Sequence, residues 1–332
     1  MANKSKRLAN NVGDNFFVDS TCINCDTCRQ LAPATFAEND DFSSVYRQPV
    51  GDAEGHAAYR ALVACPVGSI GTLQGDKAEM QQAVASFPLQ LAREGARLSE
   101  RRSAETSRLR SAPGPEGEGP VSAGPGGEGA IGGCDRHIYY NGFNSEKSFG
   151  ANSYFIQHPD GNWLIDSPRY VRHLVTAFER MGGIKYIFLT HEDDVADAGR
   201  YAAQFGATRI IHSADADAEP GAEWIIEGMD PVEVGPEFRI IPVPGHTQGS
   251  IALLYADRYL FTGDHMGWDR DVNGLRLATV YVWNEEILCR STARLLDHRF
   301  EWVLPGHADR IHLPAARMKQ ELQRLLDHRL AS

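Results

Sequence analysis

The chain has 332 residues, longer than a single hydrophobic core usually grows, so we expect two domains. Hydrophobic residues make up 42% and charged residues 23% of the chain, as in ordinary globular proteins. The net charge of −11 argues against nucleic-acid binding and against an acidic membrane surface as partner. With no signal peptide and no run of about eighteen apolar residues, we expect a cytoplasmic protein.

Four of the six cysteines are arranged as metal ligands, three on one short loop and one further along: Cys22, Cys25, Cys28 and Cys65. Three thiolates on one loop and a fourth from a distant segment are the ligand set of an iron–sulfur cluster. Structural zinc sites more often use two separated cysteine pairs. We therefore predict a cluster here, and expect Cys134 and Cys289 to be inert packed thiols.

The segment FFVDSTCINCDTCRQLAPATF and the later VACPVGSI resemble the single-cluster bacterial ferredoxins, over residues 14 to 73. Because Cys25 is present, the resemblance implies a 4Fe-4S cluster rather than a three-iron cluster. Such a domain carries one electron, so a redox partner such as a ferredoxin reductase is expected. Acidic residues near the cysteines fit either a basic reductase or a plain solvated face.

Composition divides the chain into three zones. Residues 1–80 are predicted to form the ferredoxin-like domain, and residues 134–332 the second domain. The intervening 81–133 begins with a charged, helix-prone stretch and ends in SAPGPEGEGPVSAGPGGEGAIGG. A stretch dominated by Gly and Pro buries too little apolar surface to offset its ordering entropy, so we predict a linker.

The second domain alternates between strand and helix patterns. A hairpin is predicted from Ser153–Ile156 and Trp163–Ile165, around a turn at 159–161. Further strands are expected at Tyr186–Leu189, Arg209–Ile211, Phe238–Ile241, Ile251–Tyr255, Tyr259–Phe261 and Trp302–Leu304. Helices are expected at Val171–Met181, Val195–Phe205, Glu285–Leu296 and Ala315–Leu330.

Polar loops follow four of these predicted strands. They read THEDDVAD from residue 190, PGHTQGS from 244, TGDH from 262 and LPGH from 304. A strand end that leads into a short loop lets a rigid scaffold aim side chains at one shared point.

The order and spacing of these loops, with Ile165-Asp166-Ser167, resemble the metallo-β-lactamase fold over residues 139 to 330. The resemblance implies an αββα sandwich with metal at one edge. The whole chain is then an α+β two-domain protein. Glyoxalase II, persulfide dioxygenases and flavodiiron oxidases share this fold.

One loop departs from the family pattern His-x-His-x-Asp-His. His191 occupies its first position, but Asp193 replaces the second histidine, and Val195 and Ala196 occupy the last two positions. A two-residue insertion would instead place Asp197 at the acidic position and Ala198 at the final one. In either alignment a carboxylate replaces one imidazole and a second imidazole is missing.

Transferred residue by residue, the resemblance implies that His191, Asp193 and His246 hold a first metal, with Asp264 bridging. Asp264 and His307 would remain at a second position, with Asp197 or Asp194 as a third ligand. One or two ions are therefore expected. The added carboxylate favours iron, with zinc or manganese possible, and flavodiiron oxidases also carry a carboxylate at that position.

Some of these residues have alternative roles. We favour Asp194 as the N-cap of a helix beginning at Val195 over Asp194 as a metal ligand. Asp264 and His265 are the predicted catalytic residues, although His265 fits a second-shell role or a spare ligand equally well.

Three functions fit this combination. We favour an iron-dependent oxidoreductase that acts on a small-molecule substrate and receives electrons through the cluster. The alternative is a zinc-type hydrolase of an ester or thioester whose cluster is structural or senses redox state. The missing imidazoles also allow a degenerate binding or regulatory module. The oligomeric state is left open.

Overall fold

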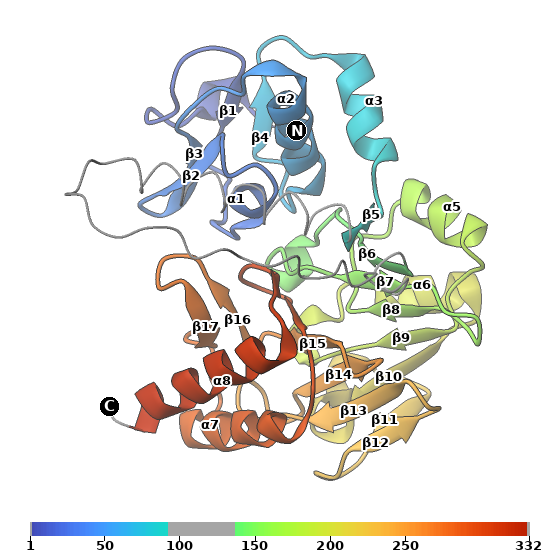
Figure 1. The fold of residues 1–332 in the computed structure, drawn as a ribbon. Coiled ribbons are helices and arrows are strands. Elements are labelled where there is room, and N and C mark those ends of the chain that lie inside the picture. Colours follow the sequence, from blue (N-terminus) through green and yellow to red (C-terminus); the bar gives the residue numbers. More distant parts are fainter. Residues whose placement is uncertain (1, 92–136, 331–332) are drawn as a thin grey trace, which may run out of the picture.

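The computed structural model describes residues 2–91 and 137–330, and Figure 1 shows them as two adjoining parts. The predicted linker over 111–133 and Cys134 lie outside these ranges.

The first part is a small α+β unit that holds the clustered cysteines. Its elements are β1 (Phe16–Val18), α1 (Thr27–Leu31), β2 (Phe36–Asn39), β3 (Phe42–Val45), α2 (Gly51–Ala64), β4 (Ile70–Thr72) and α3 (Lys77–Ala85). β1 pairs with β4 and β2 with β3, both antiparallel. Asp76 begins α3, because its carboxylate accepts the N–H groups of Ala78 and Glu79.

The second part contains two large sheets. Among the described residues the first has the order β11 (Trp224–Ile226), β10 (Thr208–His212), β9 (Tyr186–Phe188), β8 (Trp163–Ile165), β7 (Tyr154–Ile156), β6 (Ile138–Tyr140) and β5 (Leu89–Gln90). The second has the order β12 (Val232–Val234), β13 (Phe238–Pro242), β14 (Ile251–Tyr255), β15 (Tyr259–Gly263), β18 (Trp302–Pro305) and β19 (Ile311–His312). β16 (Met266–Asp269) and β17 (Gly274–Leu277) form a separate hairpin.

Side-chain alternation along the strands explains the layers. Ile240 and Leu253 belong to the core between the sheets, whereas Ile241 and Leu254 belong to a second core. Since neighbouring strand residues point to opposite faces, the second sheet is buried on both sides. Helices α7 (Glu285–Arg294) and α8 (Ala315–Leu330) cover its outer face, and α5 (Arg172–Arg180) and α6 (Ala198–Phe205) cover the first sheet (Figure 1). The predicted αββα sandwich is confirmed.

Most predicted elements of the second domain are confirmed within a few residues, but two differences matter. Helix α6 begins at Ala198, because Val195 closes a preceding 3-10 turn. Strand β5 pairs antiparallel with β6, so the segment before the linker supplies an edge strand of the first sheet. Backbone hydrogen bonds therefore join the two parts of the chain.

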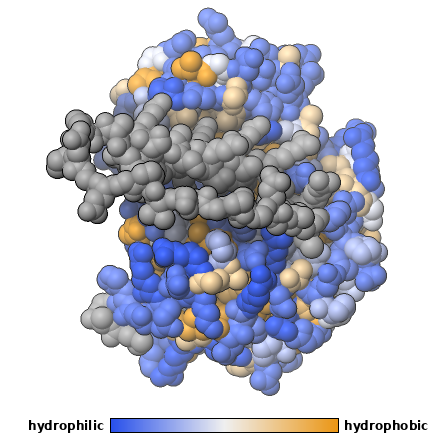
Figure 2. Space-filling model, viewed as in Figure 1, coloured by the Kyte–Doolittle hydropathy of each residue, from blue (hydrophilic) through white to orange (hydrophobic). Residues whose placement is uncertain are grey.

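None of the described helices is both long enough and apolar enough to cross a membrane. Outside the grey residues, the face seen in Figure 2 is mostly hydrophilic, with apolar side chains in small separate groups.

Candidate metal centre

Four strand ends bring the predicted ligands of the second domain to one edge of the sandwich. His191 follows β9 after two residues, His246 follows β13, Asp264 follows β15 and His307 follows β18. The parallel pairing of β15 with β18 places their carboxyl ends at the same edge. A single 3-10 turn, Glu192–Asp194, then adds two carboxylates, Asp193 and Asp194.

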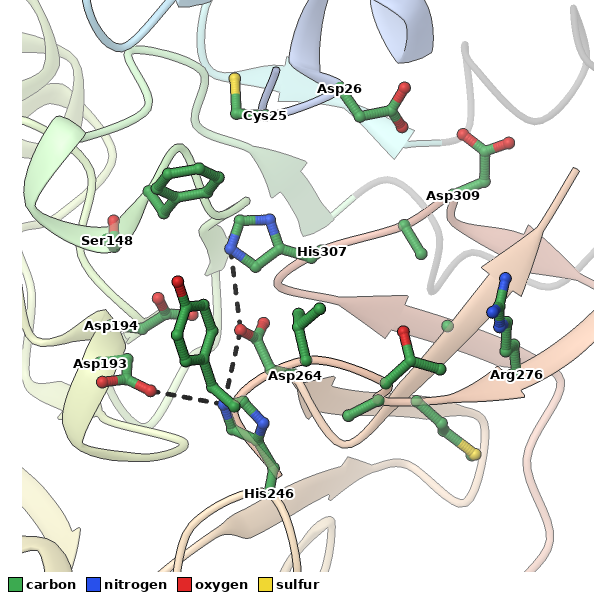
Figure 3. A pocket seen from close by; sticks show the side chains of 18 of the residues that line it. Cys25, Asp26, Ser148, Asp193, Asp194, His246, Asp264, Arg276, His307 and Asp309 are labelled. Carbon is green, nitrogen blue, oxygen red and sulfur yellow. Dashed lines mark ion pairs between the residues drawn. The ribbon is translucent and has the colours of Figure 1, made fainter. Parts of the chain in front are cut away.

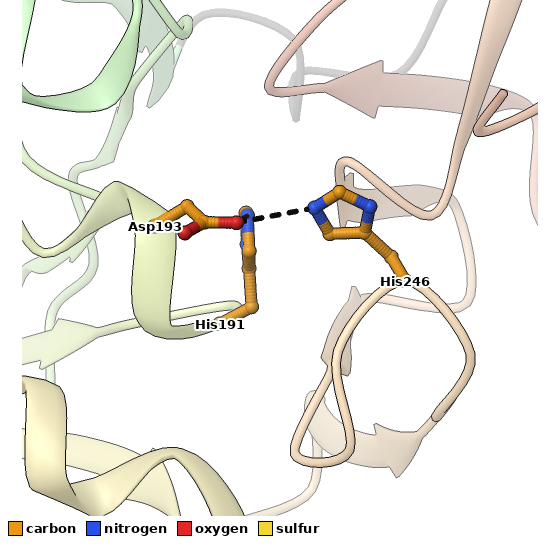
Figure 4. Close-up of side chains that lie close together, drawn as sticks. All are labelled: His191, Asp193 and His246. Atoms are coloured by element: carbon orange, nitrogen blue, oxygen red, sulfur yellow. Dashed lines mark ion pairs between the residues drawn. The ribbon is translucent and has the colours of Figure 1, made fainter. Parts of the chain in front are cut away.

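The atoms of the first predicted site converge on one point (Figure 4). Nε2 of His246 lies 3.4 Å from Oδ2 of Asp193 and 3.8 Å from Oδ2 of Asp264. Nε2 of His191 lies 3.7 Å from each of these oxygens. Such distances exceed those of hydrogen bonds, which end near about 3.2 Å. Ligands at about 2.1 Å from one tetrahedral ion lie about 3.4 Å apart. The ligand atoms of His191, Asp193 and His246 all lie within 4.8 Å of one another and therefore suit one ion, and Asp264 faces both histidines.

Buried polar atoms without a hydrogen-bond partner mark the same place. In the described residues they include Nε2 of His191, Nε2 of His246, Oδ1 of Asp264 and both carboxylate oxygens of Asp194. An unpaired buried polar group costs about 1–3 kcal/mol, so several at one point are unusual without a ligand. Bound cations would supply the missing partners of these ligand atoms, and the residues present therefore fit a metal site.

Asp194 extends this set beyond a single ion. Its carboxylate lies with His191 and Asp264 in a second group whose ligand atoms are within 4.8 Å of one another. A Cβ on Gly306 would lie 2.5 Å from Oδ1 of Asp264 and 2.9 Å from Oδ2 of Asp194. Only glycine leaves room beside both carboxylates. His307, with a side chain 32% exposed and Nε2 3.7 Å from Oδ2 of Asp264, closes the group on its open side.

The excess of carboxylates shifts the pKa values of this edge. Burial and the nearby charge of Asp264 raise the pKa of Asp194 well above its ordinary value. Burial alone would lower the pKa of His191, but Asp194, Asp264 and Asp166 raise it to about 10. Burial also opposes ionisation of Asp264, yet His307, His191 and His246 hold its pKa below the ordinary value. A bound cation would compete with protons here.

A buried threonine fixes the orientation of His191. Oγ1 of Thr190 lies 3.0 Å from Nδ1 of His191, and contacts the two oxygens of Asp166 at 3.0 and 3.1 Å. Burial raises the pKa of Asp166 to about 7. The arrangement leaves Nε2 of His191 free to face a metal, as outer partners of ligating histidines usually do. Gly263 is required beside it, because a Cβ there would lie 2.3 Å from Oγ1 of Thr190.

Asp215, which the sequence did not indicate, ties two ligand loops together. Its oxygens accept hydrogen bonds from Oγ1 of Thr247 at 2.6 Å and from the N–H of Gly249 at 2.8 Å. The N–H of Glu192 also donates to Asp215, at 3.1 Å. The loops of His191 and His246 are thus held at a fixed separation.

Two predicted site residues lie outside the donor set. Asp197 accepts from Nζ of Lys147 and from the N–H of Tyr170, both at 2.8 Å. His265 is buried, with Nε2 2.8 Å from Oγ1 of Thr292, and burial lowers its pKa to about 3. The N-cap role expected for Asp194 is wrong, because α6 begins at Ala198 and Asp197 precedes it.

The four predicted cluster ligands lie around the start of α1 and the end of α2: Cys22, Cys25, Cys28 and Cys65. Asn24 and Asp26, which lie between the first three cysteines, have left-handed backbone and bend this loop. No three of these sulfurs lie within 4.8 Å of one another, whereas a zinc tetrathiolate has S–S distances of about 3.8 Å. The wider spacing suits a multi-iron cluster. Burial raises the pKa of Cys25 to about 11, so bound iron would be needed to hold the thiolate.

A single cavity of about 1550 Å³ connects the cysteine loop with the metal donors (Figure 3). Its walls include Asn24, Cys25 and Asp26 from the first part. From the second part they include Asp193, Asp194, His246, Asp264 and His307. One cavity is thus lined both by a predicted cluster ligand and by the metal donors.

Comparison with known proteins identifies both parts. Residues 18–72 match the family described as the 4Fe-4S single cluster domain of ferredoxin I, and residues 135–300 match the metallo-beta-lactamase superfamily. The hydroxyacylglutathione hydrolase of Acidiphilium cryptum is 30% identical over 116 residues, covering 34% of this chain and 47% of the relative. That of Cereibacter sphaeroides is 36% identical over 122 residues, covering 35% and 48%. The chain therefore spans about half the length of these curated relatives.

Solved structures with a similar arrangement include the B3 metallo-beta-lactamase BLEG-1 and ETHE1 from Myxococcus xanthus. BLEG-1 is 16% identical with a TM-score of 0.44, covering 53% of this chain and 93% of its own. ETHE1 is 22% identical with a TM-score of 0.41, covering 57% and 84%.

Proposed function

This chain belongs to the metallo-beta-lactamase superfamily and carries a 4Fe-4S ferredoxin-type domain, and we propose that it is an iron-dependent oxidoreductase. In this proposal the cluster delivers electrons from an external reductase to a metal centre in the second domain. The substrate is a small molecule bound in the shared cavity.

The shared cavity is the observation that carries the proposal. Hydrolysis by a metal ion needs no electrons, so a hydrolase gains nothing from a cluster ligand in the wall of its active site. An oxidoreductase gains a short route for electrons. Cys25 and Asp264 line the same cavity, which is the arrangement such an enzyme requires.

We assign the first ion to His191, Asp193, His246 and Asp264, and a neighbouring position to Asp194, Asp264 and His307. The second assignment replaces the missing family histidine with a carboxylate that is buried and has no hydrogen-bond partner. Iron held by this oxygen-rich set would supply a one-electron couple beside the substrate. Thr190 orients His191, and Asp215 fixes the two ligand loops.

A cluster held by the four cysteines would accept one electron at a time from an external flavin-dependent or ferredoxin-type reductase. Iron held by the donors of the second domain would supply a ferric–ferrous couple able to take up that electron. The reductase would then be the electron donor, and a small-molecule substrate reduced at the iron would be the final acceptor.

A hydrolase is the second candidate, because the curated relatives are named hydroxyacylglutathione hydrolase. The cluster would then be structural or would sense redox state. A degenerate module is disfavoured, since a site without metal would leave Asp194 and both histidines unsatisfied.

Metal analysis of anaerobically purified protein distinguishes the candidates. We expect iron beyond the four atoms of the cluster, and we expect Cys22→Ser to abolish reduction of that iron by a reductase. Cys289→Ser, which removes a thiol outside both sites, is the control. Zinc alone in the second domain, with unchanged cleavage of a hydroxyacylglutathione thioester in Cys22→Ser, would establish the hydrolase instead.

A further inference from the structure

We propose that Phe149 and Gly150 carry the electron from the cluster site to the metal centre within one chain. The inference rests on the proposed function and specifies how its two cofactor sites communicate. These two residues follow the 3-10 turn Glu146–Ser148. Gly150 packs against Cys25, and Phe149 lines the cavity that the metal donors also line.

Gly150 lies directly against a cluster ligand. A Cβ at this position would lie 2.9 Å from Sγ of Cys25 and 2.8 Å from its Cβ, and the residue has a φ of +86°. Both the space and the backbone conformation therefore require glycine. A side chain here would push the second domain away from the cysteine loop.

Hydrogen bonds hold this contact in place. Oγ1 of Thr27 donates to the carbonyl of Gly150 at 3.3 Å and lies 3.4 Å from Sγ of Cys25. Nδ2 of Asn144 donates to the same carbonyl at 2.7 Å and to Oγ1 of Thr27 at 3.2 Å. These groups are buried, so the contact is part of the fold rather than a surface encounter.

Phe149 continues the path to the metal donors. Its φ of +49° is unusual for a bulky residue, and its side chain is left 56% exposed. Strained backbone conformations of this kind are found most often at functional sites. Its ring centre lies 6.4 Å from that of His307, whose Nε2 is 3.7 Å from Oδ2 of Asp264. The conformation thus costs energy but places an aromatic ring beside a metal donor in the cavity.

A salt bridge among the residues that line the cavity also links the two parts. The guanidinium of Arg270 contacts Asp26, next to Cys25, at 2.8 Å and Asp309, two residues after His307, at 2.6 Å. Each carboxylate is therefore close in sequence to one end of the path. With β5 in the first sheet as well, the separation of the two sites is fixed within the chain.

The step transfers one electron and no atoms. The cluster is oxidised from 1+ to 2+ and ferric iron at the second site is reduced to ferrous, after an external one-electron reductase has reduced the cluster. Phe149 and Gly150 are not themselves oxidised or reduced. They occupy the space between the cluster site and the metal site through which the electron passes, and Phe149 is a positioning residue.

The test follows reoxidation of the flash-reduced cluster in full-length, iron-loaded protein. We expect a first-order rate that is independent of protein concentration. Phe149→Ala should slow it about tenfold, equivalent to about 1.4 kcal/mol of barrier, with iron content unchanged. Tyr281→Ala removes another aromatic side chain from the same cavity, 90% exposed, and should leave the rate unchanged. If the alanine variant binds less iron, Phe149→Leu replaces it in the rate measurement, because leucine keeps most of the apolar volume but removes the aromatic ring.

A second readout does not depend on redox activity. With Mn²⁺ in the second site, the electron paramagnetic resonance signal of the reduced cluster should relax faster than with Zn²⁺, at every protein concentration. Equal relaxation would overturn the inference, as would equal rates in wild type and Phe149→Ala or a rate proportional to concentration. Faster relaxation with no electron transfer in iron-loaded wild type would overturn the proposed function together with the electron path, while leaving the proximity of the two sites established.

Discussion

The two cofactor regions are built in opposite ways. The cysteine region takes three of its four ligands from one loop and uses a single ligand type. The metal edge gathers ligands from four strand ends spread over residues 191–307 and mixes imidazole with carboxylate. The first is specified locally, whereas the second depends on the whole sandwich. The ligands of a local motif are inherited together, whereas the ligands of a distributed site can be replaced one at a time. Asp193, which stands where the family pattern has histidine, and Asp194, which adds a carboxylate, indicate such replacement.

Removing a shared ligand should have the largest effect and should separate the two regions. Asp264→Ala removes the carboxylate that faces all three histidines, so we expect metal affinity of the second domain to fall by more than about 100-fold. Elemental analysis should still find the iron of the cluster. Asp197→Asn changes a residue outside the donor set, so this variant should retain both the iron of the cluster and the metal of the second domain. Loss of the second-domain metal in this variant would mean that Asp197 is a metal ligand.

The contact between the regions can be broken at one glycine. Gly150→Ala forces a left-handed alanine against Cys25, and we expect a loss of about 2–4 kcal/mol in the free energy of unfolding. Gly228 has a φ of +76° with nothing within 4 Å, so Gly228→Ala should cost only about 1 kcal/mol. Thermal unfolding and cluster absorbance measure both. Equal losses would show that the cysteine loop does not press on Gly150.

The carboxylate excess predicts a pH dependence of metal binding at the metal edge. Because the pKa of Asp194 is raised, the metal-free site holds a proton that a metal must displace. Metal affinity, measured by chelator competition, should therefore rise as the pH increases through the raised pKa of Asp194. Asp194→Asn should flatten this rise and weaken binding about 10-fold to 100-fold. Asp271→Asn, at an exposed residue of the same cavity, is the control, and an unchanged pH profile in Asp194→Asn would contradict the assignment.

The smallest effect is expected at the salt bridge between the regions. The side chain of Arg270 is 37% exposed, so solvent screens its pairs and Arg270→Gln should cost no more than about 1 kcal/mol. The loss should shrink in high salt. Arg276→Gln breaks a pair with Asp269 inside the β16–β17 hairpin and is the matched control. A loss of several kcal/mol at Arg270 alone would mean that this bridge, rather than β5, holds the two parts together.

The sequence predicted what is local or carried by a family pattern. The cysteine loop follows from its motif, and the sandwich follows from the resemblance of the strand-end loops to the metallo-β-lactamase pattern. His191, His246, Asp264 and His307 were predicted from the polar loops that follow four strands and from the family pattern of those loops. The structure brings these four side chains to one edge.

What the sequence did not predict depends on long-range packing. Asp194 was expected to cap a helix, but the helix begins later and the carboxylate is left facing Asp264. The contact between Gly150 and Cys25 joins residues 125 positions apart, and Asp215 reaches the loop of His246 from 31 positions away. No periodicity or spacing encodes such contacts, because they arise only once the sheets have packed.

An anaerobic reductive titration followed by electron paramagnetic resonance tests the central claim most directly. If electrons cross from the cluster to iron in the second domain, each chain should accept one electron at the cluster and at least one more at a separate iron. Asp264→Ala should lose only the second. A chain that accepts a single electron at the cluster, with zinc at the metal edge, would contradict the account.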